Sequence, residues 1–197
     1  MFVYRCAGCG QTTRKICAHC SSKIANISPP YCSDAVVAFS YVGLVRDLML
    51  GFKYENHRAV AALFAERLLV RLRAIPNIGR IDVVTWVPTT RERRMARGHD
   101  QAETLARILG RSLGVPVRKL LERETVGHQT GLSREQRLVG VSLRARSISA
   151  PSTVLVVDDV VTTGATMRMA EQALYRAGAA RVVCIAVAAT PAPARRR

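Results

Sequence analysis

The sequence predicts an α/β protein built around a parallel β-sheet that is flanked by helices. Short apolar runs typical of buried strands recur along the chain at residues 35–41, 81–87, 153–157 and 181–188. Segments with helical periodicity alternate with these runs, and polar loops follow them. Strands that alternate with helices are typical of parallel sheets, in which ligands bind beyond the carboxyl ends of the strands.

The predicted helices have apolar side chains on one face. They are residues 42–52, 59–73, 100–113 and 166–177. Gly114 ends the third of them, and Gly178 caps the fourth. Residues 115–117 are expected to begin a short extended segment. Residues 118–148 are polar, basic and weakly periodic, and longer than an ordinary connection, so we expect either a functional loop or a disordered segment there.

The first 33 residues differ from the rest and are expected to form a small cysteine-rich module with a linker. They contain two CxxC pairs, which can supply four thiolates for a structural Zn²⁺ ion; the expected ligands are Cys6, Cys9, Cys17 and Cys20. The pairs lie close together, so Cys32 or His19 could replace one ligand, and free cysteines are the alternative. Residues 34–190 are expected to form the main domain, and residues 191–197 a disordered basic tail.

The composition indicates a chain with a sizeable core and a strong positive charge. Of its 197 residues, 49% are hydrophobic, and no apolar run reaches the roughly 18 residues of a membrane span. The first residues lack the pattern of a secretory signal, so we expect a cytoplasmic protein. The formal net charge is +16, and nearly all basic residues are arginines, which suit bidentate phosphate recognition. Solvated surface charge and an anionic partner, either a phosphorylated substrate or nucleic acid, are both compatible with this excess.

The most informative segment is residues 154–166, VLVVDDVVTTGAT. Asp158 and Asp159 directly follow an apolar strand, where carboxylates can accept hydrogen bonds from two vicinal ribose hydroxyls. Residues 162–166 then begin a helix, whose N-terminal N–H groups and dipole favour an anion. Gly164 allows the backbone to approach a phosphate without a Cβ in between. The alternative is a helix capped by Thr162 or Thr163, with exposed acidic residues before it.

Residues 158–166 resemble the signature of type I phosphoribosyltransferases, which bind 5-phosphoribosyl 1-pyrophosphate (PRPP). The resemblance implies that the catalytic candidates Asp158 and Asp159 hold the ribose hydroxyls. It also implies Mg²⁺ bound mainly through PRPP rather than by a protein cage, which agrees with magnesium's preference for phosphates and water. The residues expected to cradle the 5′-phosphate are Thr162, Thr163, Gly164, Ala165 and Thr166.

The same resemblance implies that the loop after the first sheet strand binds pyrophosphate. The residues expected there are Thr89, Thr90, Arg91 and Arg97. Residues 123–141 could fold over bound PRPP as a lid and bring Arg134 or Arg137 to the pyrophosphate. A solvated basic loop and a disordered segment, respectively, are the alternatives.

Separated motifs also resemble the ComF family of competence proteins. They are FKY at residues 52–54, RGHDQA at 97–102, QTGLSR at 129–134 and the acidic signature at 157–166. The sequence differs from that family at His99 and Asp100, where an aromatic residue and Asn are usual. Members have a phosphoribosyltransferase-like fold, commonly begin with a zinc-binding module, and are associated with natural competence and DNA uptake.

The expected function is an enzymatic one, and an accessory role is the alternative to it. The first is Mg²⁺-dependent transfer of phosphoribosyl from PRPP to an unidentified acceptor, with release of pyrophosphate. The second is a non-catalytic accessory role in DNA uptake, in which the basic surface binds single-stranded DNA and the fold docks with a helicase partner. The segments that recognise an acceptor differ widely among such folds, so the sequence leaves the acceptor unassigned.

Overall fold

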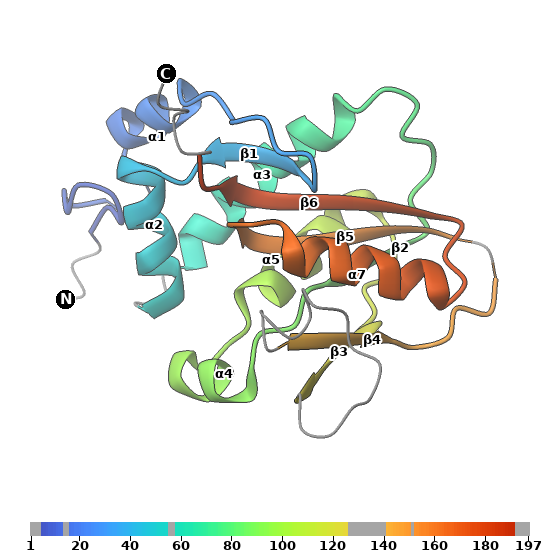
Figure 1. The fold of residues 1–197 in the computed structure, drawn as a ribbon. Coiled ribbons are helices and arrows are strands. Elements are labelled where there is room, and N and C mark those ends of the chain that lie inside the picture. The colour runs from blue at the N-terminus through green and yellow to red at the C-terminus, as the bar shows by residue number, and fades with distance from the viewer. Residues whose placement is uncertain (1–4, 14–15, 55–57, 126–140, 151, 192–197) are drawn as a thin grey trace, which may run out of the picture.

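A computed structural model describes residues 5–13, 16–54, 58–125, 141–150 and 152–191. Its central sheet has four parallel strands in the order β1 (Val36–Ser40), β6 (Arg181–Ala189), β5 (Thr153–Val161) and β2 (Val83–Trp86) (Figure 1). A parallel bridge between Val84 and Val117 continues the sheet beyond β2. The predicted α/β fold with a parallel sheet is confirmed.

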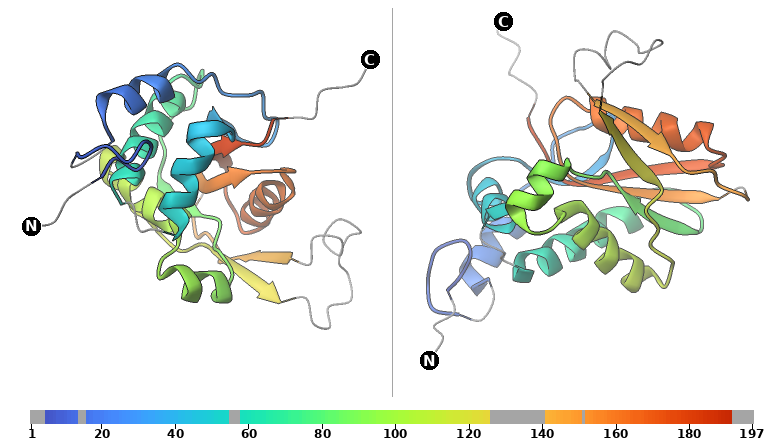
Figure 2. Two further views of the ribbon diagram at one scale, coloured as in Figure 1. Left: turned by 90° about the vertical axis from the view of Figure 1, so that its left-hand side faces the viewer. Right: turned by 90° about the horizontal axis from the view of Figure 1, so that it is seen from below.

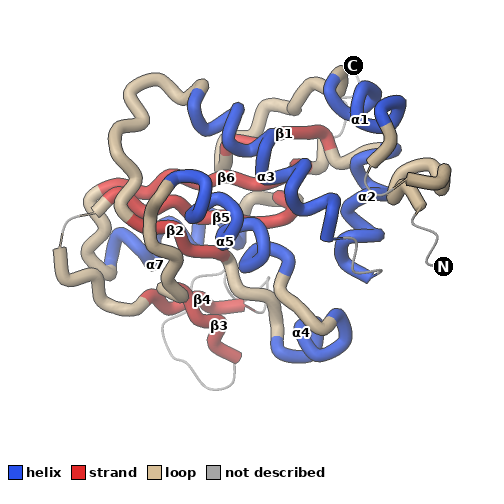
Figure 3. The backbone as a smooth tube through the Cα atoms, turned by 180° about the vertical axis from the view of Figure 1, so that it is seen from behind, coloured by secondary structure: helices blue, strands red, loops and turns tan. Residues whose placement is uncertain are grey.

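Helices cover both faces of the sheet. On one face lie α2 (Gly43–Tyr54), α3 (Arg58–Arg73) and α5 (Gln101–Leu113), with α1 (Ala18–Ala25) against α2. On the other face lie α7 (Ala165–Arg176) and an antiparallel hairpin of β3 (Leu121–Thr125) and β4 (Val141–Ala145). Figure 1 shows α7 in front of the sheet, and Figure 3, from behind, shows α3 and α5 in front.

The sheet is buried on both faces, which explains the continuous apolar runs. In β5, Leu155 and Val157 join the core formed with α2, α3 and α5, whereas Val154 and Val156 join the core under α7. This alternation follows from strand geometry, in which successive side chains point to opposite faces. Because β5 is fixed from both sides, the residues that end it have a well-defined position.

The predicted strands and helices are confirmed to within a few residues, but four elements were not predicted. Residues 118–148 were expected to be a loop or disordered, yet β3 and β4 pair in this segment. The apolar side chains that anchor the hairpin, such as the fully buried Leu121, are interrupted by charged residues, so no apolar run marks either strand. Helices α4 (Arg91–Arg97) and α1 are the other two. Arg134 and Arg137 lie outside the described residues, and no described helix is long and apolar enough to span a bilayer.

Candidate functional site

A cavity of about 380 Å³ lies at the carboxyl ends of β2 and β5, where ligands bind in parallel α/β sheets. It is lined by Tyr41, Lys53, Val87, Pro88, Thr89, Arg93, Arg97, Asp100, Gln101, Ala102, Arg123, Asp158, Asp159, Val160, Thr162 and Thr166. The lining therefore combines an acidic pair with four cationic side chains. It also brings together the acidic signature and the loop after β2, as the sequence predicts.

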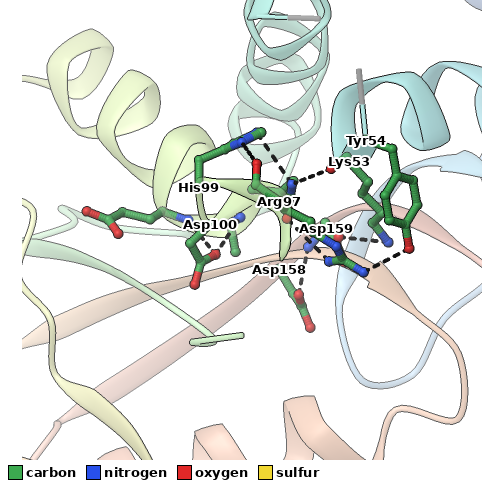
Figure 4. Close-up of polar contacts among 10 residues, drawn as sticks. Lys53, Tyr54, Arg97, His99, Asp100, Asp158 and Asp159 are labelled. Carbon is green, nitrogen blue, oxygen red and sulfur yellow. Dashed lines mark hydrogen bonds and ion pairs between the residues drawn. The ribbon is translucent and has the colours of Figure 1, made fainter. Parts of the chain in front are cut away.

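The acidic pair lies in the last part of β5, which extends to Val161 rather than ending at Val157 as predicted. Burial raises the pKa of Asp158 well above its usual range, and the neighbouring Asp159 carboxylate raises it further. The backbone N–H of Asp159 donates to Asp158 Oδ1 over 2.7 Å, and Lys53 Nζ lies 2.8 Å from Asp159 Oδ2 (Figure 4). Lys53 and Arg123 both act to lower the pKa of Asp158.

The turn after β5 leads directly into α7. Its N-cap is Gly164, with φ 75°, and no side chain caps the helix; the Ala165 N–H has only a long contact of 3.4 Å to Thr163 Oγ1. Thr162 and Thr166 line the cavity, so the uncapped N-terminus of α7 adjoins the acidic pair. The alternative of a helix capped by Thr162 or Thr163 is not observed, because the N-cap is Gly164 and the Thr163 hydroxyl makes only this long contact. This arrangement of N–H groups and dipole suits an anion.

Gly164 is also required by a close contact with Asp34, which lies just before β1. A Cβ at this position would lie 2.0 Å from Oδ2 of Asp34. Asp34 forms an ion pair of 2.9 Å with Arg168, which also donates to the carbonyl of Thr163 over 3.2 Å. Asp34 and Arg168 thus fix the outer side of the turn.

The loop after β2 provides the basic wall of the cavity. Its Thr89 N–H donates to Asp100 Oδ2 over 2.9 Å. Thr90 is the N-cap of α4 and accepts from the Arg93 N–H, so its hydroxyl has a structural partner. Arg97 lines the cavity as predicted, whereas Thr90 and Arg91 are not among the lining residues.

The sequence gives no specific role to three of the cations in the lining, although Arg93 belongs to the basic loop expected to bind pyrophosphate. Arg93 is one residue among several arginines, and nothing in the sequence distinguishes it. Lys53 was noted within the FKY motif, but without a role. Arg123 comes from the unpredicted hairpin and donates to the carbonyl of Pro88; burial lowers its pKa, while the Asp158 carboxylate acts in the opposite direction.

The cysteine module contains a second candidate site. The Sγ atoms of Cys6, Cys9, Cys17 and Cys20 all lie within 4.8 Å of one another. Burial raises the pKa of the Cys6 thiol, but hydrogen bonds from backbone N–H groups, including those of Cys17 and Gly8, outweigh it and lower the pKa to about 6. Four converging soft sulfur ligands fit a tetrahedral metal such as Zn²⁺. Neither Cys32 nor His19 belongs to this cluster.

Comparison with known proteins identifies similar sequences. A family model described as "Phosphoribosyl transferase domain" matches residues 99–197. The chain is 26% identical to competence protein F of Haemophilus influenzae, over 88% of this chain and 85% of the relative. It is 25% identical to competence protein ComFC of Streptococcus pneumoniae, over 88% and 82%. It is 26% identical to the DNA utilization protein YhgH of Escherichia coli, over 84% and 74%.

Solved structures with a similar fold include two adenine phosphoribosyltransferases. The enzyme from Thermoanaerobacter pseudethanolicus has a TM-score of 0.44 and 13% identity, over 68% of this chain and 83% of that one. The enzyme from Saccharomyces cerevisiae has a TM-score of 0.41 and 17% identity, over 72% and 73%.

Proposed function

The chain belongs to the phosphoribosyl transferase domain family, and we propose that it binds PRPP with Mg²⁺ and transfers the phosphoribosyl group to an acceptor, releasing pyrophosphate. The observation that carries this proposal is the composition of one cavity. It contains an acidic pair, an uncapped helix N-terminus and a basic wall, which match the ribose, the 5′-phosphate and the pyrophosphate of one ligand.

In this proposal the acidic pair accepts hydrogen bonds from the ribose hydroxyls. The turn at residues 162–166 holds the 5′-phosphate with backbone N–H groups and threonine hydroxyls. The pyrophosphate is faced by Thr89, Arg93, Arg97 and Arg123. Each guanidinium group can donate two parallel hydrogen bonds to phosphate oxygens. These assignments retain Thr89 and Arg97 from the sequence analysis and add two arginines from the cavity lining.

The remaining predicted pyrophosphate residues have supporting roles in the proposal. Thr90 caps α4 and thereby orients Arg93 and Arg97, and Arg91 adds to the positive charge of the loop. Arg134 and Arg137, which lie outside the described residues, remain predicted contacts of a closing lid.

The reaction requires the bond between ribose C1 and the pyrophosphate oxygen to break while the acceptor forms a bond to C1. Positive charge develops on the ribose, and the departing pyrophosphate gains negative charge. The carboxylates stabilise the first charge and the arginines the second, so catalysis depends on positioning and electrostatics, without covalent attack by the protein. Mg²⁺, a hard cation suited to carboxylate and phosphate oxygens, would neutralise part of the pyrophosphate charge when bound.

Isothermal titration with PRPP and Mg²⁺ tests the proposal. Asp158→Asn combined with Asp159→Asn should weaken binding at least about tenfold, because one acceptor oxygen of each side chain is replaced by an amide donor and the negative charge is lost, at a cost of about 1 kcal/mol each. Asp47→Asn, an exposed change on α2, is the matched control and should leave binding unchanged. A parent protein that binds no PRPP contradicts the proposal.

Turnover is tested separately. Pyrophosphate release is measured with PRPP, Mg²⁺ and a panel of nucleobases and amines. A release rate that depends on one class of acceptor identifies the second substrate. PRPP binding without release under every condition would instead favour a regulatory or accessory role.

We also propose that the protein serves DNA uptake or utilisation, as the names of its relatives suggest for those proteins. The net charge of +16 favours a second candidate function, binding of single-stranded DNA as an accessory to a helicase partner. If the basic surface contacts phosphates, affinity for single-stranded DNA should fall steeply with added salt. Affinity that is insensitive to salt counts against this second function.

A further inference from the structure

Lys53 lies at the edge of the cavity, on the last turn of α2. Its neighbour Phe52 is fully buried and packs against the rings of Phe64 and His99, at centroid distances of 6.3 and 5.8 Å. The side-chain amide of Gln101 donates to the Lys53 carbonyl over 3.4 Å. The backbone of Lys53 is therefore fixed against α5, beside the carboxyl ends of the strands.

The ammonium group of Lys53 is directed to the acidic pair (Figure 4). Its Nζ lies 2.8 Å from Asp159 Oδ2, and the two side chains are only 15% and 17% exposed. An ammonium group is strongly hydrated, so burial to this degree is unfavourable unless a carboxylate compensates for it. Among the described residues, Asp159 is the carboxylate within ion-pair distance of Lys53.

A divalent cation would need the same carboxylate oxygens as the ammonium group. Lys53 is part of the chain and lies next to Asp159. A free metal ion must therefore displace the ammonium group and also overcome the repulsion from its positive charge. A metal ion that arrives on a pyrophosphate group brings compensating negative charge and most of its own ligands. The ion pair therefore opposes the binding of a free metal ion at Asp159 more than it opposes the binding of the metal complex of PRPP.

We propose that Lys53 is a positioning residue that acts as a tethered counter-ion: it keeps free divalent metal off Asp159 until a metal–pyrophosphate ligand enters the cavity. The identity of that ligand rests on the function proposed above, but the exclusion of free metal does not. The competing explanation is that the ion pair only stabilises the packing of α2, in which case the affinity for metal is independent of Lys53.

The test is a titration of ligand-free protein with Mn²⁺, followed by the electron paramagnetic resonance signal of unbound Mn²⁺. The cysteine site is first saturated with Zn²⁺ so that it does not contribute. Lys53→Met should bind Mn²⁺ about tenfold or more tightly than the parent, because a unit charge beside the carboxylate has been removed at partial burial. Lys53→Arg keeps the charge and should resemble the parent. The double variant Lys53→Met/Asp159→Asn should lose the increase in Mn²⁺ affinity that Lys53→Met shows.

Equal Mn²⁺ affinity in the parent and in Lys53→Met overturns the proposal, provided that the fluorescence of the buried Trp86 shows an intact fold. A gain that persists with Asp159→Asn also overturns it, because the metal then binds elsewhere. Lys53→Gln replaces Lys53→Met if the latter does not fold. PRPP is absent from the titration, so a failure of PRPP binding would overturn the proposed function and leave this result standing.

Discussion

A single buried carboxylate, that of Asp100, connects the helix α5 to the loop that follows β2. Its side chain is 5% exposed. Oδ1 accepts from the N–H groups of Ala102 and Glu103 over 3.0 and 3.2 Å, which caps α5. Oδ2 accepts from the N–H of Thr89 over 2.9 Å, which fixes the loop at the basic wall of the cavity.

Two substitutions of Asp100 separate these interactions. Asp100→Ala removes the helix cap, at a cost of about 1 kcal/mol. It also removes the hydrogen bond to the half-buried Thr89 N–H, at a cost of about 1–3 kcal/mol, so the free energy of unfolding should fall by about 2–4 kcal/mol. Asp100→Asn keeps an oxygen for the cap but places an amide donor opposite the Thr89 N–H. It should lower the free energy of unfolding by about 1–3 kcal/mol, less than Ala.

The pH dependence gives an independent check. Burial raises the pKa of Asp100, against the opposing effect of its backbone hydrogen bonds, chiefly that of Thr89. A raised folded-state pKa means that the folded protein binds the proton more tightly than the unfolded chain, so this carboxyl favours folding most at low pH. Its contribution is lost as the pH rises from about 4 through the raised folded-state pKa. The stability difference between the parent and Asp100→Asn should therefore shrink over that range.

Urea denaturation followed by the fluorescence of Trp86, the only tryptophan, measures these differences. PRPP affinity measured on the folded variants reports the position of the Thr89 loop and should fall in both. The structure indicates that the helix cap and the loop contact are separate interactions of Asp100. Equal losses in the free energy of unfolding for Asp100→Asn and Asp100→Ala would contradict this. If neither lowers the free energy of unfolding by more than about 0.5 kcal/mol, the carboxylate does not connect the two elements.

Three further predictions concern other positions. Gly164→Ala should lower the free energy of unfolding by about 1–3 kcal/mol and weaken PRPP binding, since φ is 75° and the new Cβ would lie 2.0 Å from Asp34 Oδ2. Gly110→Ala should destabilise the protein by about 1–3 kcal/mol despite the helix propensity of Ala, since its Cβ would lie 2.2 Å from Val117 Cγ2. Cys20→Ser should lower the zinc content measured by mass spectrometry and the melting temperature.

Each of these predictions has a matched control. Val117→Ala removes the atom that clashes in Gly110→Ala, so the double variant should recover part of the lost stability. Asp34→Ala should relieve the contact in Gly164→Ala but leave its backbone strain. Cys184→Ser changes a half-buried cysteine of β6 outside the sulfur cluster and should not alter the zinc content. Full zinc content in Cys20→Ser would contradict the assignment of the metal site.

The strands could be predicted from the sequence because the sheet is buried on both faces. In β5 each face packs into a separate core, so every position from Val154 to Val157 is apolar and the run is unmistakable. The hairpin lacks this signal because only alternate residues face α7, and partners such as Glu122 and Arg144 are charged. Helix α4 has no buried residue at all, so apolar periodicity could not reveal it.

The positions of the acidic pair and of the turn into α7 could be predicted because they form one continuous segment. The turn follows the strand directly, so the sequence places it at the carboxyl end of β5. Lys53 and Arg123 could not be assigned in the same way, because they come from α2 and the hairpin and meet the acidic pair only in the fold. The sequence shows them as two basic residues among thirty, with no local pattern that relates them to Asp158.

The cysteine module is connected to the acidic pair indirectly, through the helix α2 that carries Lys53. The module lies beside α2 (Figure 2). The packing is close, because a Cβ at Gly8 would lie 2.9 Å from both Cys20 Sγ and Leu44 Cδ1. The buried side chain of Ile24, on α1, joins the core formed with α2 and α3. Because α2 carries Lys53, a metal that orders the four cysteines would also fix the helix that presents the counter-ion to Asp159. The cysteine module can therefore affect the position of Lys53 through α2, although none of its described residues lines the cavity.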